Sequence, residues 1–249
     1  MRVIFLGTNG WYDTDTGNTI CILIRTTDYE IILDAGNGLY KIDQYIPEGS
    51  KKPVFLFLSH FHLDHIVGLH TLMKFNFSQG LTICGPAGTR DILGIFINKP
   101  FTASFSQLPY AVIIYELPEE HIKLPFRVES RPLHHPSLTL GYRIEIEDTV
   151  ISYCPDTGYC DNAPLLARSA DLLIAECAYK GGQFSENWPH LNPETAARIA
   201  GEADAKRLAL VHFDAETYKT IAERKESERI AQKIFKNTFI TTDTMEIEL

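Results

Sequence analysis

A short stretch of the chain, residues 59–65, contains several side chains of the kinds that bind metal ions. His60 and His62 are two residues apart, so their imidazoles can converge on one cation from a tight turn. Asp64 and His65 follow directly and can reach a second cation nearby. Neutral imidazole suits zinc, iron, nickel and copper, and a carboxylate adds the negative charge that a dication needs. The stretch therefore predicts a site for divalent metal.

The segments on either side of this stretch suit such a site. Residues 54–58 are an unbroken apolar run with the length and composition of a buried strand, and residues 66–73 have the apolar spacing of an amphipathic helix. Open α/β sheets place functional groups at the carboxyl ends of strands. The alternative is a histidine-rich surface turn that binds no metal, and the flanking strand and helix favour the metal site.

Further along the chain, one predicted segment after another stops at a histidine or a carboxylate. Segments 126–131, 149–152, 172–176 and 208–212 read as strands, and residues 189–194 precede a predicted helix at 195–203. Any one such ending alone is more often a helix cap or a satisfied polar residue. Together with the first cluster they favour one shared site. The candidate side chains are His134, His135, Asp156, Glu176, His190 and His212.

The first third of the chain predicts strands at 2–6, 19–25 and 29–34, joined by polar turns. Asp34 closes the third of them before a Gly-rich bend. It is either a plain helix cap or a carboxylate that holds a metal-bound histidine, and the sequence leaves both open. The glycine-rich turn 85–89 opens a predicted helix to residue 98 and could cradle phosphate, but it lacks the P-loop spacing and lysine.

Two later segments, residues 99–126 and 216–236, also have predicted structures. Residues 99–126 contain several prolines and are predicted to be irregular, which is typical of a lid or binding loop. Within them His121 is predicted to be a solvated surface histidine. A long charged helix is predicted over residues 216–236.

Composition limits the classes of function. The chain has 249 residues, is 45% hydrophobic and carries a net charge of −9. It can bury a sizeable core as one large domain or two fused halves. The acidic balance disfavours a general nucleic-acid binder, although a local basic patch is open. That patch would comprise Lys123, Arg127, Arg131 and Arg143.

The cysteines and the apolar runs point to a cytoplasmic protein. The chain has 5 cysteines, an odd number without a Cys-x-x-Cys pair, which predicts reduced thiols. Most are expected to be buried, and Cys154 or Cys160 could line the site because both flank Asp156. No apolar run reaches the length of a membrane span, and the amino terminus predicts a first strand rather than a signal peptide.

The order of these residues resembles the metal-binding signature of the metallo-β-lactamase superfamily. The resemblance covers essentially the whole chain and implies an α/β fold, a four-layer αββα sandwich. It implies one domain over residues 1–249, built from two βα halves with the metals at one edge. By this resemblance, one metal takes His60, His62 and His135 and the other takes Asp64, His65 and His212, with Asp156 as the bridge. His135 is chosen over His134 because the related branch places the ligand six residues before a Gly-Tyr pair, here Gly141 and Tyr142.

Within the superfamily the chain looks most like the phosphodiesterase branch. Residues 85–89, 141–143, Asp156-Thr157 and the region of His190 carry this likeness. The branch includes the tRNA 3′-processing endonuclease RNase Z and the phosphoribosyl cyclic phosphate phosphodiesterases. It implies catalytic roles for Asp64, His190 and Glu176, with His190 contacting the scissile phosphate or assisting the leaving group. The alternative for His190 is a surface histidine at the start of a helix.

Two departures from that branch bear on the substrate. RNase Z has a long protruding arm before the bridging aspartate, whereas only residues 144–155 separate Arg143 from Asp156 here, which is room for a hairpin. The cyclic phosphodiesterase has a cysteine-rich amino-terminal segment, and residues 7–18 here contain no cysteine. Neither relative's substrate can therefore be assumed.

The sequence thus predicts a binuclear metal-dependent hydrolase that acts on a small or cyclic phosphodiester. The expected cofactors are two divalent ions, zinc first, with manganese or iron as alternatives. The expected partner is a small-molecule diester, with nucleic acid disfavoured, no membrane, and a homodimer compatible with the sequence. Other functions stay open: an RNase Z-like endonuclease without the arm, a lactone or thioester hydrolase, a di-iron redox protein, or a metal-stabilised binding module. The redox alternative lacks room for a flavin domain.

Overall fold

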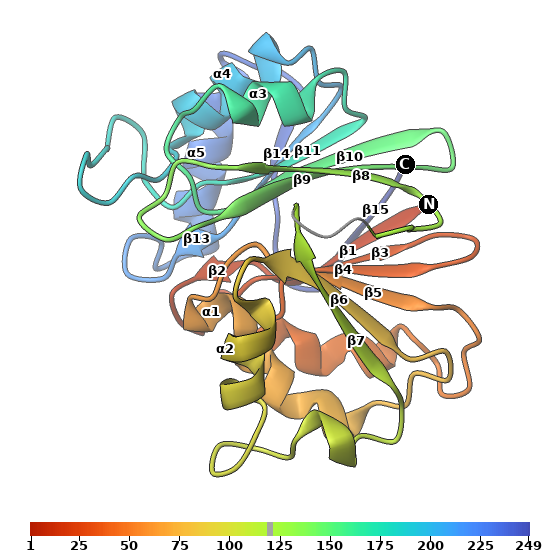
Figure 1. Cartoon of the computed structure of the whole chain (residues 1–249). Helices are drawn as coiled ribbons and strands as arrows, with labels where there is room; N and C mark the ends of the chain where they lie inside the picture. Colours follow the sequence, from red (N-terminus) through yellow and green to blue (C-terminus); the bar gives the residue numbers. More distant parts are fainter. Residues whose placement is uncertain (119–121) are drawn as a thin grey trace.

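Two β-sheets face each other in the computed structural model, which describes residues 1–118 and 122–249 (Figure 1). The first sheet is mixed: its strands pair antiparallel from β15 through β1 and β3 to β4, and parallel from β4 through β5 and β6 to β7. Its strand order is β15 (Met245–Glu248), β1 (Arg2–Gly7), β3 (Cys21–Arg25), β4 (Glu30–Leu33), β5 (Val54–Phe57), β6 (Leu81–Pro86) and β7 (Val112–Leu117).

The second sheet is also mixed. Its strand order is β14 (Thr238–Ile240), β12 (Leu208–Val211), β11 (Leu172–Glu176), β10 (Thr149–Cys154), β9 (Leu140–Ile146) and β8 (Arg127–Pro132). A short parallel pair, β2 (Asn9–Gly10) and β13 (Phe213–Asp214), joins the two halves beside the sheets.

Helices cover the outer face of each sheet, which gives four layers and confirms the predicted αββα sandwich (Figure 1). Among the described residues, no helix combines the length and apolarity needed to cross a membrane. The first sheet carries η1 (Asn37–Gln44), α1 (Leu63–Ile66), η2 (Val67–Lys74), α2 (Thr89–Phe96) and η3 (Phe105–Gln107). The second carries α3 (Asn162–Ala167), α4 (Pro193–Glu202) and α5 (Ile221–Gln232).

The near-continuous apolar strands follow from burial on both faces. In β3, Ile22 and Ile24 enter the core between the sheets, while Leu23 packs under the first helical layer. In β11, Ile174 enters the central core and Leu173 packs against the second helical layer. Because alternate side chains of a strand point to opposite faces, every position of such a strand must be apolar.

The strand directions gather the predicted site at one edge. β4, β5 and β6 are parallel to one another, as are β10, β11 and β12. The carboxyl ends of β5, β10 and β12 lead directly into the segments 59–65, 155–158 and 212–214. Parallel strands end at a common edge, so residues distant in sequence meet there.

Several predicted elements differ from the structure. Residues 112–117, expected to be irregular, form β7, which pairs in parallel with β6 as the edge strand of the first sheet. Residues 66–73 are mostly a 3-10 helix that follows the short α1. The long charged helix begins only at Ile221, because a turn at Asp214 and a capping box at Thr220 come first. His121 lies outside the described residues.

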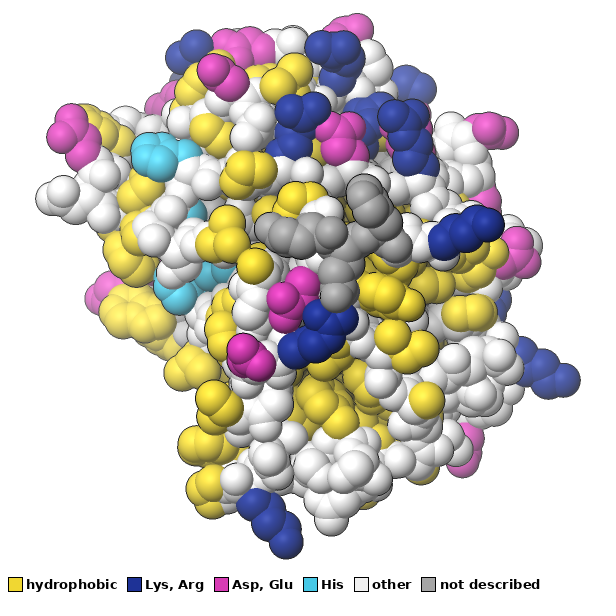
Figure 2. Space-filling model, viewed as in Figure 1, with side chains coloured by type: hydrophobic (Ala, Val, Ile, Leu, Met, Phe, Trp, Pro, Cys, Tyr) yellow, Lys and Arg dark blue, Asp and Glu magenta, His cyan; other side chains and the backbone are white. Residues whose placement is uncertain are grey.

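The proposed basic patch is largely neutralised by acidic neighbours. Arg127 and Arg143 both pair with Glu145, and Arg131 pairs with Glu129. Lys123 is exposed nearby. Figure 2 shows basic and acidic side chains interspersed on this side rather than one basic face.

A buried arginine ties α5 to the amino-terminal loop. The guanidinium of Arg224 donates to Thr8 Oγ1 (2.9 Å), Asn9 Oδ1 and Thr16 Oγ1 (3.0 Å), and it lies 4.6 Å from the centre of the Phe213 ring. Residues 8–16 include Trp11 and Tyr12, which lie beside the candidate site, so Arg224 anchors one of its walls from 208 to 216 residues away in sequence.

We expect Arg224→Ala to lower the free energy of unfolding by about 3 kcal/mol, because buried acceptors would lose their partner. Urea unfolding followed by circular dichroism measures the change. Arg229→Ala is the matched control, since Arg229 lies on the same helix in an exposed pair with Glu226 and should leave the value nearly unchanged. Equal effects of the two substitutions would contradict the anchoring role.

Candidate metal centre

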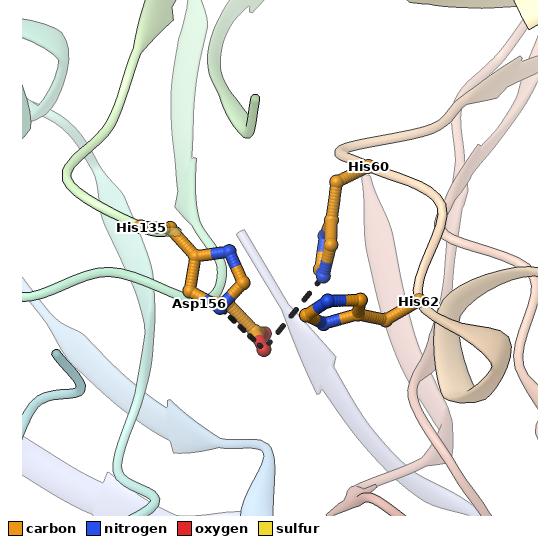
Figure 3. A group of neighbouring side chains, drawn as sticks. All are labelled: His60, His62, His135 and Asp156. Carbon is orange, nitrogen blue, oxygen red and sulfur yellow. Dashed lines mark ion pairs between the residues drawn. The ribbon is translucent and has the colours of Figure 1, made fainter. Parts of the chain in front are cut away.

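One group of four ligand-type side chains joins the two halves of the sandwich. His60 and His62 come from the segment after β5, and His135 and Asp156 come from segments after β8 and β10 (Figure 3). One ligand atom of each lies within 4.8 Å of those of the others. Asp156 Oδ2 is 3.9 Å from the Nε2 atoms of both His60 and His135. The structure therefore brings together the residues that the sequence assigned to the first cation.

A second group lies beside the first and shares its carboxylate. Asp64, His65 and His212 place one ligand atom each within 4.8 Å of one another. Asp156 Oδ1 is 3.1 Å from His65 Nε2 and 3.2 Å from His212 Nε2. Asp64 Oδ2 is 3.2 Å from His212 Nε2. The two oxygen atoms of Asp156 thus face different groups, which suits a carboxylate shared between two cations.

The donor atoms of both groups fit divalent cations. His60 Nε2 and His135 Nε2 are buried and have no hydrogen-bond partner among the described residues, although buried polar atoms normally have one. In the second group, His65 Nε2 and His212 Nε2 are only 3.1 Å apart. Nitrogen and carboxylate oxygen are ligands that zinc and similar metals prefer. A cation in each group would satisfy these atoms.

Neighbouring hydroxyl groups fix which nitrogen each imidazole presents. Ser59 Oγ lies 2.9 Å from His60 Nδ1, and Thr139 Oγ1 lies 3.1 Å from His135 Nδ1. Both histidines are left to present Nε2. His62 presents the other nitrogen: Ser137 Oγ lies 3.1 Å from its Nε2, which leaves Nδ1 to face a cation. Such partners orient metal-binding histidines and set their tautomers.

Asp34 supports His65, which decides between its two predicted roles. Asp34 Oδ2 is 2.8 Å from His65 Nδ1 and accepts from the Tyr153 hydroxyl at 2.6 Å. The same carboxylate accepts from the backbone N–H and hydroxyl of Ser59. The residue before η1 is Gly36, which makes no side-chain cap. Asp34 is therefore the carboxylate that orients a histidine, rather than a helix cap.

The electrostatics differ between the two groups. Burial lowers the pKa of His60 and His62, and lowers that of His135 to about 4, so these imidazoles are neutral and able to bind a cation at neutral pH. Burial also opposes protonation of His65 and His212, but the adjacent Asp156 carboxylate raises the pKa of both. The carboxylates that attract a proton there attract a metal cation for the same reason.

The amino-terminal loop closes over the second group. The backbone N–H of Trp11 donates to Asp64 Oδ2 at 2.7 Å. A Cβ atom on Gly10 would lie only 2.4 Å from Cε1 of His212, so this close approach of backbone and imidazole requires glycine. The loop anchored by Arg224 thereby helps to position Asp64 and His212.

His190 and Glu176, predicted as catalytic residues, form a pair beside both groups. His190 Nδ1 lies 2.6 Å from Glu176 Oε1, and that carboxylate also accepts from the backbone N–H groups of Thr157 and Ala178. Burial opposes a charge on His190, but Glu176 raises its pKa to about 9. The ring centre of His190 is 5.6 Å from that of His135. His190 thus carries a proton within reach of the centre at neutral pH.

A cavity of about 710 Å³ opens over the centre. In Figure 2, histidine side chains reach the surface among hydrophobic ones at this edge of the molecule. The cavity contains ligand-type residues from both groups together with aromatic side chains that the sequence reasoning missed. Its lining is Trp11, Tyr12, His62, Leu63, Asp64, Asp156, Ala178, Trp188, His190, His212 and Asp214. The missed signal was Trp188, which lies in a polar loop two residues before the candidate His190, whereas Trp11 has no candidate ligand near it in the sequence.

Other sequence candidates lie apart from the centre. His134 is exposed, and it is His135 that joins the first group. Cys154 is buried in the core and Cys160 packs beside it, and neither is among the residues that line the cavity. The turn at 85–89 is not among them either, and Thr89 Oγ1 donates to Pro86 within that turn.

Comparison with known proteins agrees with this geometry. The sequence of residues 29–213 matches the protein-family model described as the beta-lactamase superfamily domain. The chain is 29% identical over 218 residues to the probable metallo-hydrolase YhfI of Bacillus subtilis, covering 86% of this chain and 87% of that protein. It is 26% identical over 309 residues to ribonuclease Z of Bacillus cereus, covering 98% of this chain and 97% of the relative.

Solved structures share the fold. The crystal structure of the metallo-beta-lactamase fold protein YhfI superposes with a TM-score of 0.79 at 24% identity, over 99% of both chains. Human tRNase Z, short form, superposes with a TM-score of 0.77 at 23% identity, over 100% of this chain and 99% of that one. The predicted resemblance in fold and family is confirmed.

We expect Asp156→Ala to abolish or strongly reduce binding of divalent metal, because both groups would lose their shared carboxylate. Elemental analysis of purified, metal-loaded protein measures the bound ions. His134→Ala is the matched control and should bind as much metal as the wild type, whereas His135→Ala should bind less. Unchanged metal content in Asp156→Ala would contradict the assignment.

Asp34→Asn should keep the fold but weaken metal binding by about 10- to 100-fold, since a carboxylate that orients a ligand histidine would be lost. Competition with a chromogenic chelator gives the affinity. Asp28→Asn, in an exposed turn of the same half, provides the comparison. Equal affinities in both variants would remove Asp34 from the metal centre.

Proposed function

The chain belongs to the beta-lactamase superfamily of metallo-hydrolases, and we propose that it uses two divalent cations to hydrolyse a small or cyclic phosphodiester. Zinc is the first choice of metal, with manganese and iron as alternatives. The observation that carries the proposal is the 2.6 Å contact between His190 Nδ1 and Glu176 Oε1, which lies beside a carboxylate shared between two ligand groups.

The proposed ligands divide between the two positions. His60, His62 and His135 would hold one cation, and Asp64, His65 and His212 the other, in both cases with Asp156. Divalent cations held in this way supply Lewis acidity, which lowers the pKa of water and neutralises charge that develops on a reacting phosphoryl group.

His190 would act as the proton donor. Glu176 accepts from Nδ1, so the Nε2–H is the one available to a substrate in the cavity that His190 lines. Departure of an alkoxide from phosphorus needs a proton, and a positioned imidazolium can provide it. Glu176 fixes the ring orientation, maintains the charge on His190 and is itself held by two backbone N–H groups.

The short connection between β9 and β10 favours a small substrate. Glu147 and Asp148 link these strands in a tight turn, and both have positive φ, at 50° and 58°. Such two-residue turns close a hairpin and leave no room for a protruding arm. The nearby arginines are paired with glutamates, so this side offers little charge for gripping a polyanion.

The second candidate is an RNA endonuclease. It is favoured by the similarity to ribonuclease Z over 98% of this chain. Against it, the alignment of 309 residues is longer than this chain, so that relative contains residues with no counterpart here. Cleavage of a precursor tRNA by the metal-loaded protein, faster than that of small diesters, would favour the endonuclease.

Turnover of bis(p-nitrophenyl) phosphate and of a cyclic phosphodiester, with zinc or manganese, tests the proposed reaction. Asp156→Ala should lose activity, and equal rates in wild type and variant would exclude the metal mechanism. Lactone and thioester substrates belong in the same panel, because faster turnover of those esters would favour a carbonyl hydrolase. Metal-dependent stability without any turnover would indicate a binding module.

We expect His190→Ala to slow hydrolysis of a diester with an alkyl leaving group by about 10²- to 10⁴-fold. The same substitution should affect a p-nitrophenyl diester far less, because p-nitrophenolate leaves without a proton. Steady-state kinetics on the two substrates gives the ratio. His70→Ala, an exposed histidine on η2, is the control. Similar losses on both substrates would exclude His190 as the proton donor.

A further inference from the structure

Both tryptophans of the chain lie at the mouth of the same cavity. The sequence contains 2 tryptophans, and Trp11 and Trp188 both line the space over the metal centre. Their exposed fractions are 64% and 48%, which is high for such large apolar side chains. Tyr12 and Leu63 are also partly exposed there. Exposed apolar clusters are uncommon on soluble proteins, and where they occur they often mark a binding site.

Trp11 is held rigidly in its exposed position. Its φ is +72°, a left-handed conformation that is rare for a bulky residue and is typical of functional sites. Its backbone N–H donates to Asp64 Oδ2, and its ring contacts Tyr12 edge to face at 5.2 Å between ring centres. The Tyr12 hydroxyl in turn donates to Glu216 at 2.9 Å. The two rings therefore form a fixed aromatic surface.

Trp188 provides a second aromatic surface next to the first ligand group. Its ring is nearly parallel to that of His62, with an interplanar angle of 12° and 5.8 Å between ring centres. The Tyr179 hydroxyl donates to the backbone carbonyl oxygen of Trp188 at 2.7 Å, and the backbone N–H of Trp188 donates to Ser185 Oγ. The backbone of Trp188 is thus held by its loop, and its ring centre lies 6.1 Å from that of His190.

The charges around the cavity limit what else could bind there. None of the described residues that line it is a lysine or arginine, and Asp214 adds a carboxylate. Among the described lining residues outside the proposed ligands, His190 is the side chain that its raised pKa leaves cationic, so the several outer phosphates of a nucleoside triphosphate or a long nucleic-acid strand would lack lysine or arginine counterions there. A diester with a single negative charge and an apolar planar group matches both the charge and the aromatic walls.

We propose that Trp11, Tyr12 and Trp188 form a subsite that stacks on a planar aromatic group of a monoanionic phosphodiester. The inference rests on the proposed function for the phosphate and extends it to the class of substrate. Stacking of a planar ring on such side chains favours aromatic over saturated groups of equal size.

The tryptophans themselves report on binding, because no other tryptophan contributes to the fluorescence. Metal-loaded protein is titrated with benzyl(methyl)phosphinate, a monoanion without an ester linkage whose two carbon–phosphorus bonds resist hydrolysis, while tryptophan emission is followed. (Cyclohexylmethyl)(methyl)phosphinate is the saturated probe of the same charge. We expect the aromatic probe to change the emission and to bind roughly 10-fold more tightly than the saturated probe.

Single substitutions separate the aromatic subsite from general effects. Trp11→Leu and Trp188→Leu each keep one tryptophan as reporter and should weaken binding of the aromatic probe about 10-fold, with little effect on the saturated one. Phe101→Leu is the control, since Phe101 is 65% exposed but does not line the cavity. Equal affinities for the two probes, or equal losses of both in the tryptophan variants, would overturn the proposal.

The experiment also separates this inference from the proposed function. Selective binding of the aromatic probe without hydrolysis of any diester would retain the subsite and reject the phosphodiesterase. Diester hydrolysis with no aromatic preference in binding or KM would retain the phosphodiesterase and reject the subsite.

Discussion

The structure depends on one constraint: several imidazole nitrogens and carboxylate oxygens lie close together at one edge of the sandwich, and their lone pairs need protons or cations between them. His65 Nε2 and His212 Nε2 face each other at 3.1 Å, and carboxylate oxygens of Asp64 and Asp156 lie at similar distances. Few hydrogen-bond donors lie among them, and lone pairs this close repel one another unless protons or cations intervene. Divalent cations would remove that repulsion. Because the ligands come from both sheets, each bound cation would also link the two halves and add its binding free energy to the stability of the fold.

Around this group, buried polar contacts keep the ligands in place. Asp34, from the first sheet, receives the hydroxyl of Tyr153, from the second, while it orients His65. Gly10 allows the backbone to approach His212, and Arg224 holds the loop in which Gly10 lies. These contacts span the sandwich, so the geometry of the centre is a property of the whole fold rather than of the ligand segment alone. That is why a short sequence stretch, although rich in histidine, would not form this centre in isolation.

The ligand-type residues were predictable because they follow parallel strands, and the ends of parallel strands share one edge of a sheet. That rule and the apolar runs place Asp156 and His212 at one edge of the second sheet and segment 59–65 at one edge of the first, and the resemblance to a known family supplied the meeting of the two edges. The resemblance to a known family supplied the pairing of ligands and the preference for His135. Asp34 remained ambiguous because its partner, His65, lies 31 residues away and only the fold brings them together.

Other features could not be read from local patterns. Residues 112–117 lie between prolines and form an edge strand only because β6 offers a partner. The start of α5 is set by a turn and a capping box that interrupt a charged segment with helical composition. Trp11 and Trp188 line the same cavity, although they are far apart in the sequence, and only the folding of both halves brings them together.

X-ray absorption spectroscopy of the metal-loaded protein distinguishes a paired centre of histidine and carboxylate ligands from other arrangements. We expect only nitrogen and oxygen ligands, at about 2.0–2.2 Å, with no sulfur at about 2.3 Å. We also expect a second metal at about 3.5–4 Å from the first. A sulfur ligand, or a loaded protein in which no metal neighbours another, would contradict the paired centre described here.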